Sequence, residues 1–315
     1  MPSPAIDVVN LTHSYGERVA LNGLSLRVEP GEIFGLLGPN GSGKTTLFRI
    51  LSTLIPAPAG AVKIFDADVA ANRDAVRQLI GVVFQSASLD KQLSARENLR
   101  YHGAIYGLGG EELRKRVDDA LQSFKLADRA SDRVSGFSGG MRRRVEVAKG
   151  LLHHPRLLLM DEPSTGLDPA ARIDLWQIIR DVSKRQGVTV LMTTHLMEEA
   201  DRCDRLGIMA GGKLLACDTP DALKAQIGGD VITLSSRSPK ELARTVNEKL
   251  GTAAQVFDQH VRIERQAGHQ LVPQLIEAAP GLVDSVSLGK PNLEDVFIRL
   301  TGKRLLSEEE STPAE

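Results

Sequence analysis

A glycine-rich run near the N-terminus is the first feature with clear chemical potential. Residues 38–45 read Gly-Pro-Asn-Gly-Ser-Gly-Lys-Thr and fit the pattern G-x-x-x-x-G-K-[ST] at every fixed position. The glycines let the backbone curl so that successive N–H groups face one phosphate, and a helix N-terminus behind them adds positive potential. Lys44 can reach the β- and γ-phosphates of a nucleotide, and the Thr45 hydroxyl can ligate Mg²⁺. The run therefore predicts a cradle for a nucleoside triphosphate.

The segments that flank this run are those that such a cradle requires. Residues 33–37 form a short apolar run typical of a buried strand, and a helix is predicted over residues 45–54. This context argues against a chance match, which about one chain in 100 of this length would contain. We therefore expect a P-loop NTPase. The residues predicted to bind the nucleotide here are Gly38, Pro39, Asn40, Gly41, Ser42, Gly43, Lys44, Thr45 and Thr46.

Two adjacent acids follow a second apolar strand, residues 157–160. Consecutive strand residues point to opposite sides, so Asp161 and Glu162 can do different work. Asp161 can hold the coordination sphere of Mg²⁺, and Glu162 can polarise and deprotonate the attacking water. The alternative is a solvated pair that ends the strand, but the phosphate cradle favours the catalytic interpretation.

Short apolar strands alternate with helices through the first 225 residues or so. Strands are predicted over residues 33–37, 80–84, 157–160 and 189–193. This alternation indicates an α/β core whose mainly parallel sheet is covered on both faces. Helices predicted over 96–106 and 111–124 form a helical insertion at about residues 90–150. We assign residues 1–228 to this nucleotide-binding domain.

The pattern changes after Gly228-Gly229. Strands over 231–234, 254–257, 261–264 and 283–288 and helices over 239–250 and 271–279 give the order β-α-β-β-α-β of a ferredoxin-like module. We expect a small α+β accessory domain over residues 229–302, which a helix over 293–300 completes. Residues 303–315 lack an apolar pattern and are expected to form a disordered tail.

Composition excludes several classes of function. The 315 residues include 39 basic and 40 acidic side chains, for a net charge of −1, so nothing favours binding to nucleic acid or an anionic membrane. The two cysteines, Cys203 and Cys217, have no spacing typical of a metal site or disulfide framework. No apolar run approaches the ~18 residues of a membrane span, and residues 1–7 lack the basic and apolar pattern of a secretion signal, so we expect none. We expect a soluble, cytoplasmic protein.

Residues 137–141, Phe-Ser-Gly-Gly-Met, identify the kind of P-loop protein. They resemble the LSGGQ signature of ABC ATPases. Gln85 resembles the family's Q-loop glutamine, residues 164–168 its D-loop, and His195 its switch histidine. Tyr15 lies where the family places an aromatic ring that stacks on adenine. The resemblance covers about residues 5–225 and implies an ATPase that uses ATP and Mg²⁺.

The resemblance also implies a nucleotide site that needs residues from two chains. In this family Ser138, Gly139 and Gly140 bind the γ-phosphate held by a partner subunit, which implies a homodimer or a pair with a related ATPase subunit. A helix that starts with Ser-Gly-Gly offers a hydroxyl and free N–H groups to an anion. The resemblance also implies that His195 contacts the γ-phosphate and that Gln85 contacts the metal and the water. Met141 replaces the usual glutamine.

Each of these side chains also has a structural alternative. Tyr15 could pack on the N-terminal strands, His195 could be a hydrogen-bonded histidine at a strand end, and Gln85 could be an ordinary polar loop residue. The three arginines at 142–144 fan around a helix, so we interpret them as a solvated face rather than an anion site.

The segment Pro-Asn-Leu-Glu-Asp-Val-Phe at residues 291–297 resembles the C-terminal extension of daunorubicin-resistance and nodulation-type ABC ATPases. That branch implies separate membrane permease chains of the ABC-2 type, export of a drug, lipid or glycolipid, and a peripheral position on the cytoplasmic face of the membrane. Residues 86–100 are expected to contact the membrane subunit. The alternatives are an importer ATPase and a soluble ABC ATPase outside transport. The chain has one set of motifs and none of the insertions that the soluble members carry.

Overall fold

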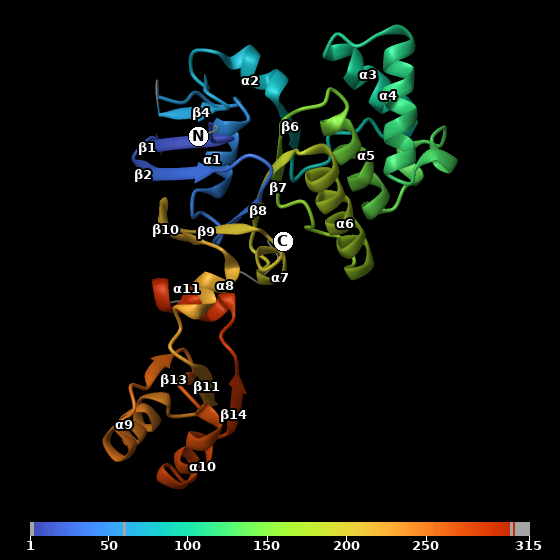
Figure 1. The fold of residues 1–315 in the computed structure, drawn as a ribbon. Helices are drawn as coiled ribbons and strands as arrows, with labels where there is room; N and C mark the ends of the chain where they lie inside the picture. The colour runs from blue at the N-terminus through green and yellow to red at the C-terminus, as the bar shows by residue number, and fades with distance from the viewer. Residues whose placement is uncertain (1–2, 59–60, 303–304, 306–315) are drawn as a thin grey trace. The chain divides into compact units, whose positions relative to one another are not determined.

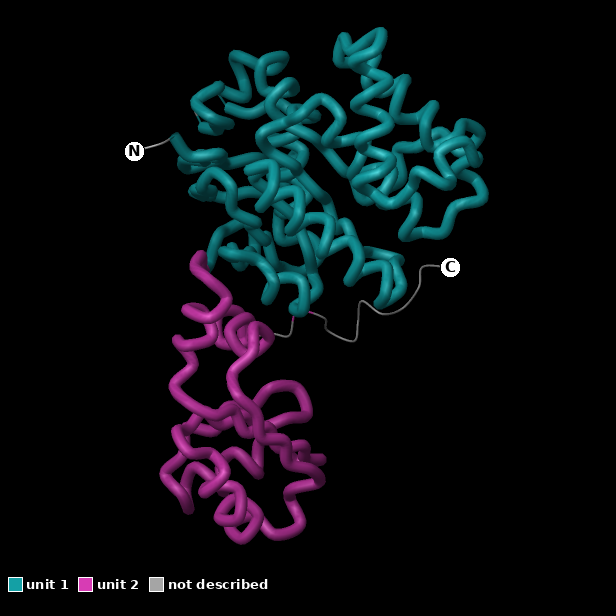
Figure 2. The backbone as a smooth tube through the Cα atoms, turned by 45° about the vertical axis from the view of Figure 1, so that its right-hand side comes forward, with its two compact units in different colours: residues 1–215 teal, residues 216–315 magenta. Residues whose placement is uncertain are grey.

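The computed structural model describes residues 3–58, 61–302 and 305. The chain forms two compact units, residues 1–215 and 216–315 (Figure 2). The second unit therefore starts before the predicted domain boundary at residues 228 and 229. The predicted disordered tail, apart from Leu305, lies outside the described residues.

A six-stranded sheet in the order β10-β9-β3-β8-β7-β6 organises the first unit, whose last residue, Leu215, lies within the edge strand β10. Its strands are β3 (Ile33–Leu37), β6 (Ile80–Val83), β7 (Leu157–Asp161), β8 (Thr189–Thr194), β9 (Arg205–Ala210) and β10 (Lys213–Asp218). The pairs from β9 to β6 are parallel, and every residue of β3, β7 and β8 is buried, as expected for a sheet covered on both faces. Leu37 pairs with Thr194 and Asp161 with Thr193, so these strand ends meet at one edge. The predicted α/β core is confirmed.

A second, antiparallel sheet was not predicted. It has the order β2-β1-β4-β5 and consists of β1 (Ile6–Tyr15), β2 (Arg18–Val28), β4 (Val62–Ile64) and β5 (Ala67–Asp68). Helix α1 (Lys44–Leu51) contacts β2 of this sheet and β7 and β8 of the large sheet (Figure 1). The two sheets therefore share the helix that follows the phosphate-binding loop.

The helical insertion contains α3 (Ala95–Ile105) and α4 (Gly110–Ser123), each within one residue of its predicted bounds. Two 3₁₀ turns follow (Ala127–Arg129 and Val134–Gly136), and then α5 (Gly139–Leu151). Helix α5 lies between the α3–α4 pair and β6 (Figure 1). The remaining helices of this unit are α2 (Arg73–Leu79), α6 (Pro169–Gln186) and α7 (Met197–Ala200).

The second unit has the predicted β-α-β-β-α-β order. Strands β11 (Asp230–Ser235), β12 (Gln255–Phe257), β13 (His260–Arg265) and β14 (Ser285–Gly289) form an antiparallel sheet in the order β12-β13-β11-β14. Helices α9 (Pro239–Leu250) and α10 (Gly268–Ala278) cover it around a core that includes Ile232, Leu234, Val246 and Leu275. Helices α8 (Pro220–Ala225) and α11 (Leu293–Thr301) pack on each other. The ferredoxin-like prediction is confirmed.

Candidate active site

The glycine-rich run forms a tight loop between β3 and α1. Gly41 and Gly43 have φ angles of 76° and 103°, which side chains disfavour. A Cβ at Gly38 would lie 2.4 Å from the carbonyl oxygen of Met209, and one at Gly43 would lie 2.6 Å from that of Ala20. Gly43 is the N-cap of α1 and provides no side-chain cap, so the first turn presents its N–H groups to the loop.

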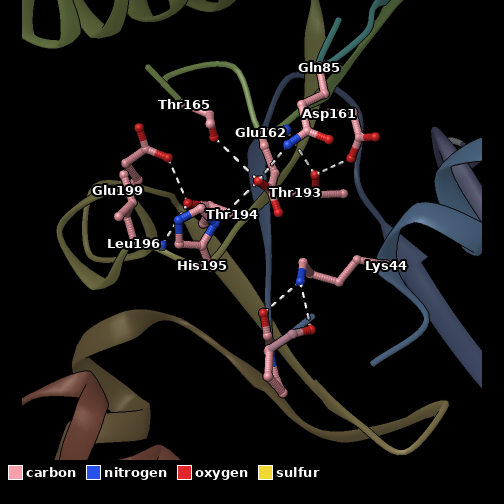
Figure 3. Close-up of polar contacts among 12 residues, drawn as sticks. Lys44, Gln85, Asp161, Glu162, Thr165, Thr193, Thr194, His195, Leu196 and Glu199 are labelled. Atoms are coloured by element: carbon pink, nitrogen blue, oxygen red, sulfur yellow. Dashed lines mark hydrogen bonds and ion pairs between the residues drawn. The ribbon is translucent and has the colours of Figure 1, made fainter. Parts of the chain in front are cut away.

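Lys44 lies under this loop with 4% of its surface exposed. Its Nζ donates hydrogen bonds to the carbonyl oxygens of Gly38, at 2.6 Å, and Pro39, at 2.9 Å (Figure 3). A pocket of about 380 Å³ opens above it. The residues that line the pocket are Tyr15, Arg18, Ala20, Asn40, Gly41, Gly43, Lys44, Thr45, Thr46 and Arg49. Most of the predicted nucleotide-binding residues thus surround one cavity.

Tyr15 stands at the rim of the same pocket, where the β1–β2 hairpin turns. Its ring is 45% exposed and lies edge-on to His13, with the ring centroids 4.9 Å apart. The ring is thus not packed away between the N-terminal strands. Arg18, which pairs with Tyr15 across the hairpin, also lines the pocket. Neither Arg18 nor Arg49 was predicted, because no motif marks them.

Asp161 ends β7, and Thr193 of the neighbouring strand donates a hydrogen bond from Oγ1 to Asp161 Oδ1 at 2.6 Å. The pKa of the Asp161 carboxyl is raised above its usual value, because the effect of burial outweighs the opposite effects of the Thr193 hydroxyl and the Lys44 charge. A carboxylate, the Thr45 hydroxyl and the Gln85 amide are the oxygen donors that Mg²⁺ takes when phosphate and water complete its shell. Among the described residues no cluster of three acidic, histidine or cysteine side chains forms a dedicated metal cage.

Glu162 leaves the strand through a strained turn. Its φ is 44°, and its N–H donates to Thr193 Oγ1 at 3.0 Å and to the Thr193 carbonyl oxygen at 3.2 Å. Strand alternation is therefore the wrong explanation for the different directions of the two acids. Because Glu162 lies beyond β7, a left-handed backbone turn separates it from Asp161.

Three side chains converge on one oxygen of Glu162 (Figure 3). Oε2 accepts from Gln85 Nε2 at 3.2 Å and from Thr165 Oγ1 at 3.3 Å, and it lies 3.2 Å from Nδ1 of His195. The hydrogen bond from His195 lowers the pKa of Glu162, and the same contact raises the pKa of His195. Glu162 is therefore held ionised, as a carboxylate that takes a proton from water must be.

A buried carboxylate that was not predicted holds the turn after β8. Thr194 donates from Oγ1 to Oε2 of Glu199 at 2.6 Å, and the same hydroxyl accepts from the N–H of Leu196 at 2.9 Å. Glu199 is 4% exposed. These contacts hold the residues on both sides of His195 and so set the direction in which it leaves the strand.

The signature residues lie elsewhere. Ser138 is the exposed N-cap of α5 and accepts from the N–H of Met141 at 3.2 Å, and Gly139 and Gly140 form the first turn. A Cβ at Gly140 would lie 2.8 Å from Cβ of Ala171, so glycine allows α5 and α6 to approach closely. None of the three signature residues lines the pocket above Lys44.

The predicted solvated face at residues 142–144 is wrong for Arg143. This side chain is 6% exposed and forms an ion pair with Glu146, one turn later on α5, at 2.9 Å. Burial is compensated because Arg143 finds a carboxylate and two backbone carbonyls on the inner side of the helix.

Comparisons with known proteins agree with this geometry. Residues 21–165 match the family described as ABC transporter. The chain is 40% identical over 309 residues to the daunorubicin resistance ATP-binding protein DrrA3 of Streptomyces coeruleorubidus, covering 96% of this chain and 97% of that protein. It is also 40% identical over 312 residues to the Nod factor export ATP-binding protein I of Paraburkholderia xenovorans, covering 97% and 99%.

Solved structures show the same fold. The cbiO1 protein of Clostridium perfringens, part of the ABC transporter complex cbiONQ, matches 79% of this chain and 96% of its own with a TM-score of 0.66 and 27% identity. The dimeric post-hydrolysis structure of the ATP-binding cassette MJ0796, bound to ADP and Pi, matches 68% and 98% with a TM-score of 0.61 and 28% identity.

Proposed function

Because the chain belongs to the family of ABC transporter ATP-binding proteins, we propose that it is the ATP-hydrolysing subunit of an exporter whose membrane-spanning part is made by separate chains. The observation that supports this most directly is the convergence of Gln85, Thr165 and His195 on Glu162, at the sheet edge that also carries the Lys44 loop. Relatives that match over nearly their whole length are named for daunorubicin resistance and for Nod factor export. The cargo we propose is therefore a hydrophobic drug, lipid or glycolipid.

The hydrolytic steps follow from the side chains around the pocket. Residues 38–46 wrap the phosphates, Lys44 exchanges its two carbonyl partners for phosphate oxygens, and Tyr15 stacks on the adenine. Thr45, Asp161 and Gln85 would hold Mg²⁺, which would neutralise charge on the phosphates. Glu162 then accepts a proton from the attacking water, and His195 contacts the γ-phosphate.

The separation of Ser138 from the Lys44 pocket supports a dimer. The exposed N-terminus of α5 offers a hydroxyl and free N–H groups that can bind an anion, but it does not line the nucleotide pocket of its own chain. We propose that two copies, or one copy and a related ATPase subunit, place Ser138, Gly139 and Gly140 of each on the nucleotide of the other. The relative MJ0796 has been solved as a dimer.

The membrane partner is proposed to be an ABC-2 type permease that docks beside the loop after Gln85. A pocket of about 250 Å³ opens there, lined in part by Phe84, Ser88, His102 and Lys149. No helix in residues 3–58, 61–302 or 305 combines the length and hydropathy needed to cross a bilayer. We propose that the chain sits at the cytoplasmic face of the membrane on that partner.

A mixing experiment tests the shared site. Lys44→Ala removes the lysine from the phosphate-binding loop of a chain. Ser138→Ala removes the hydroxyl that a chain provides to the nucleotide of its partner. Each variant alone should be nearly inactive. In an equal mixture half of the dimers are mixed, and each of these keeps one intact site, so ATPase activity should recover to about a quarter of the original. A mixture as inactive as its components, with mixed dimers shown to form, would refute the shared site.

The membrane partner has a separate test. The tagged chain should co-purify from detergent-solubilised membranes with one integral membrane protein. The amount should fall when the exposed face of α3 is changed, for example by Tyr101→Arg, next in sequence to the pocket-lining His102. Recovery only from the soluble fraction would favour a non-transport ATPase instead.

A further inference from the structure

Helix α5 carries three charged side chains that face inward. Arg143, Glu146 and Lys149 are spaced three residues apart and are 6%, 3% and 9% exposed. Charged residues are seldom buried this deeply unless partners compensate for the loss of water. All three side chains point to one short segment, residues 84–88, which follows β6 and contains Gln85.

Their partners are mostly main-chain atoms of that segment. Arg143 donates from Nη1 to the Phe84 carbonyl at 2.8 Å and from Nη2 to the Gln85 carbonyl at 3.3 Å. Glu146 accepts from the N–H of Ser88 at 2.8 Å with one oxygen and pairs with Arg143 through the other. Lys149 donates to the Ser88 carbonyl at 2.7 Å and to its hydroxyl at 2.6 Å. The backbone on both sides of Gln85 is therefore attached to α5.

The two ends of this attachment are functional positions. Ser138 is the N-cap of helix α5, and the attached segment places the side-chain amide of Gln85 beside Glu162, with Nε2 3.2 Å from Oε2. Gln85 itself is exposed and packs in no core, so its backbone anchor decides where the amide points. A displacement on the order of 1 Å at such a position is enough to slow catalysis considerably.

We propose that Arg143 and Glu146 are positioning residues that hold Gln85 against Glu162 in the same chain by fixing residues 84–88 to the signature helix. This inference rests on the proposed function. Because the same helix presents Ser138 to the partner, movement of the signature toward the partner's nucleotide carries Gln85 with it. The buried pair thus links the position of Ser138, which acts in the partner's site, to the position of Gln85 in the chain's own site.

The test removes the pair without leaving one buried charge alone. Arg143→Met combined with Glu146→Met replaces an ion pair by apolar side chains, a change that folded proteins often tolerate. ATP affinity and the thermal midpoint should stay near those of the unchanged protein, because residues 38–46 are untouched. The kcat should fall about tenfold or more. Arg143→Lys, which keeps a charge and a donor, should recover part of the loss, and Arg144→Met, on the same helix, should have little effect.

Mixed dimers distinguish positioning from damage to the signature. The one intact site of the mixture uses Gln85 and Glu162 of the Ser138→Ala chain and Ser138 of the Lys44→Ala chain. We expect loss of activity when the double substitution is added to the Ser138→Ala chain and little change when it is added to the Lys44→Ala chain. The reverse pattern, or unchanged kcat in both, overturns the proposal.

Two further outcomes remain decisive. If the double variant does not fold, Arg143→Lys is placed in each chain in turn and is judged by the same comparison. If the unmodified mixture never recovers activity, the dimeric site itself has failed. In that case the homogeneous double variant still tests the inference, because a normal kcat at normal ATP affinity would contradict any role for the pair in positioning Gln85.

Discussion

The Nδ1 atom of His195 lies 3.2 Å from Oε2 of Glu162, although the residues come from loops that follow different strands. The contact exists because β7 and β8 are neighbours whose ends are level, with Asp161 opposite Thr193. Gln85 reaches the same oxygen from the loop after β6, which borders β7 on its other side. Three adjacent parallel strands thus bring a carboxylate, an imidazole and an amide to one point beside the phosphate loop.

Glu162→Gln tests the carboxylate. The amide cannot accept a proton from water, so kcat should fall about 10²- to 10⁴-fold. ATP affinity should change little, because Lys44 and the glycine-rich loop are unaltered. Steady-state phosphate release and equilibrium binding of ATP measure the two quantities. With ATP present the variant should also elute as a longer-lived dimer, and turnover within about fivefold of normal would remove Glu162 as the base.

Much of this site could be predicted because the strands that carry it are continuous apolar runs. The bounds of β3 were predicted to the residue, and those of β7 and β8 to within one, since every residue of these strands is buried and the polar residues of β7 and β8 lie only at the strand ends. The N-terminal sheet was missed for the opposite reason. Its pairing of β1 with β2 shifts register between Val8 and Leu11 and again near His13, which destroys the two-residue alternation that marks a strand.

Two features of the site depend on distant parts of the chain. Nothing in the run Arg142–Arg144 indicates that its middle member is buried, because its backbone partners lie 58 and 59 residues earlier. The positive φ of Glu162 is equally hidden, since it is maintained by hydrogen bonds to Thr193 of another strand. Sequence patterns report local periodicity, and both features are set by tertiary contacts.

Tyr15→Ala tests base stacking. The ring is half exposed at the rim of the pocket, and loss of an aromatic contact should weaken ATP binding about three- to tenfold. The loss should be the same for ADP, because the ring contacts the base and not the phosphates. Tyr15→Trp, which keeps an aromatic face, is the matched control. If the alanine variant binds ATP and ADP as tightly as the original protein does, the ring has only a packing role.

His102→Gln tests a partly buried histidine that lines the proposed docking pocket. Burial, with help from Lys149 and His153, lowers the pKa of His102 to about 4. An unfolded chain binds this proton near pH 6.5. The folded-state pKa is the lower one, so the neutral ring stabilises the fold fully above pH 6.5, and this contribution is lost as the pH falls toward 4.

Unfolding of the two proteins at pH 7, 6 and 5 provides the measurement. After allowance for partial exposure, the original protein should lose about 1–2 kcal/mol more than the glutamine variant between pH 7 and pH 5. Parallel pH profiles for the two proteins would show that His102 is not held neutral in the folded state.

Truncation tests where the nucleotide-binding unit ends. Helix α8 packs on α11, and Leu223 and Ile227 are 0% and 4% exposed. A chain cut after Gly229 keeps α8 and loses α11, so these side chains become exposed. A chain cut after Asp218 loses both helices and keeps Met209, whose carbonyl packs against Gly38.

We therefore expect the fragment 1–218 to stay dispersed and the fragment 1–229 to bind more of an apolar dye and to aggregate sooner on warming. Both should bind ATP with the affinity of the full chain, because residues 38–46 and Tyr15 are retained. Dimer formation with ATP should be weaker in both if the C-terminal unit stabilises the pair. Equal behaviour of the two fragments on warming would show that α8 does not depend on α11, and the unit would then end where the sequence places it, after Gly228.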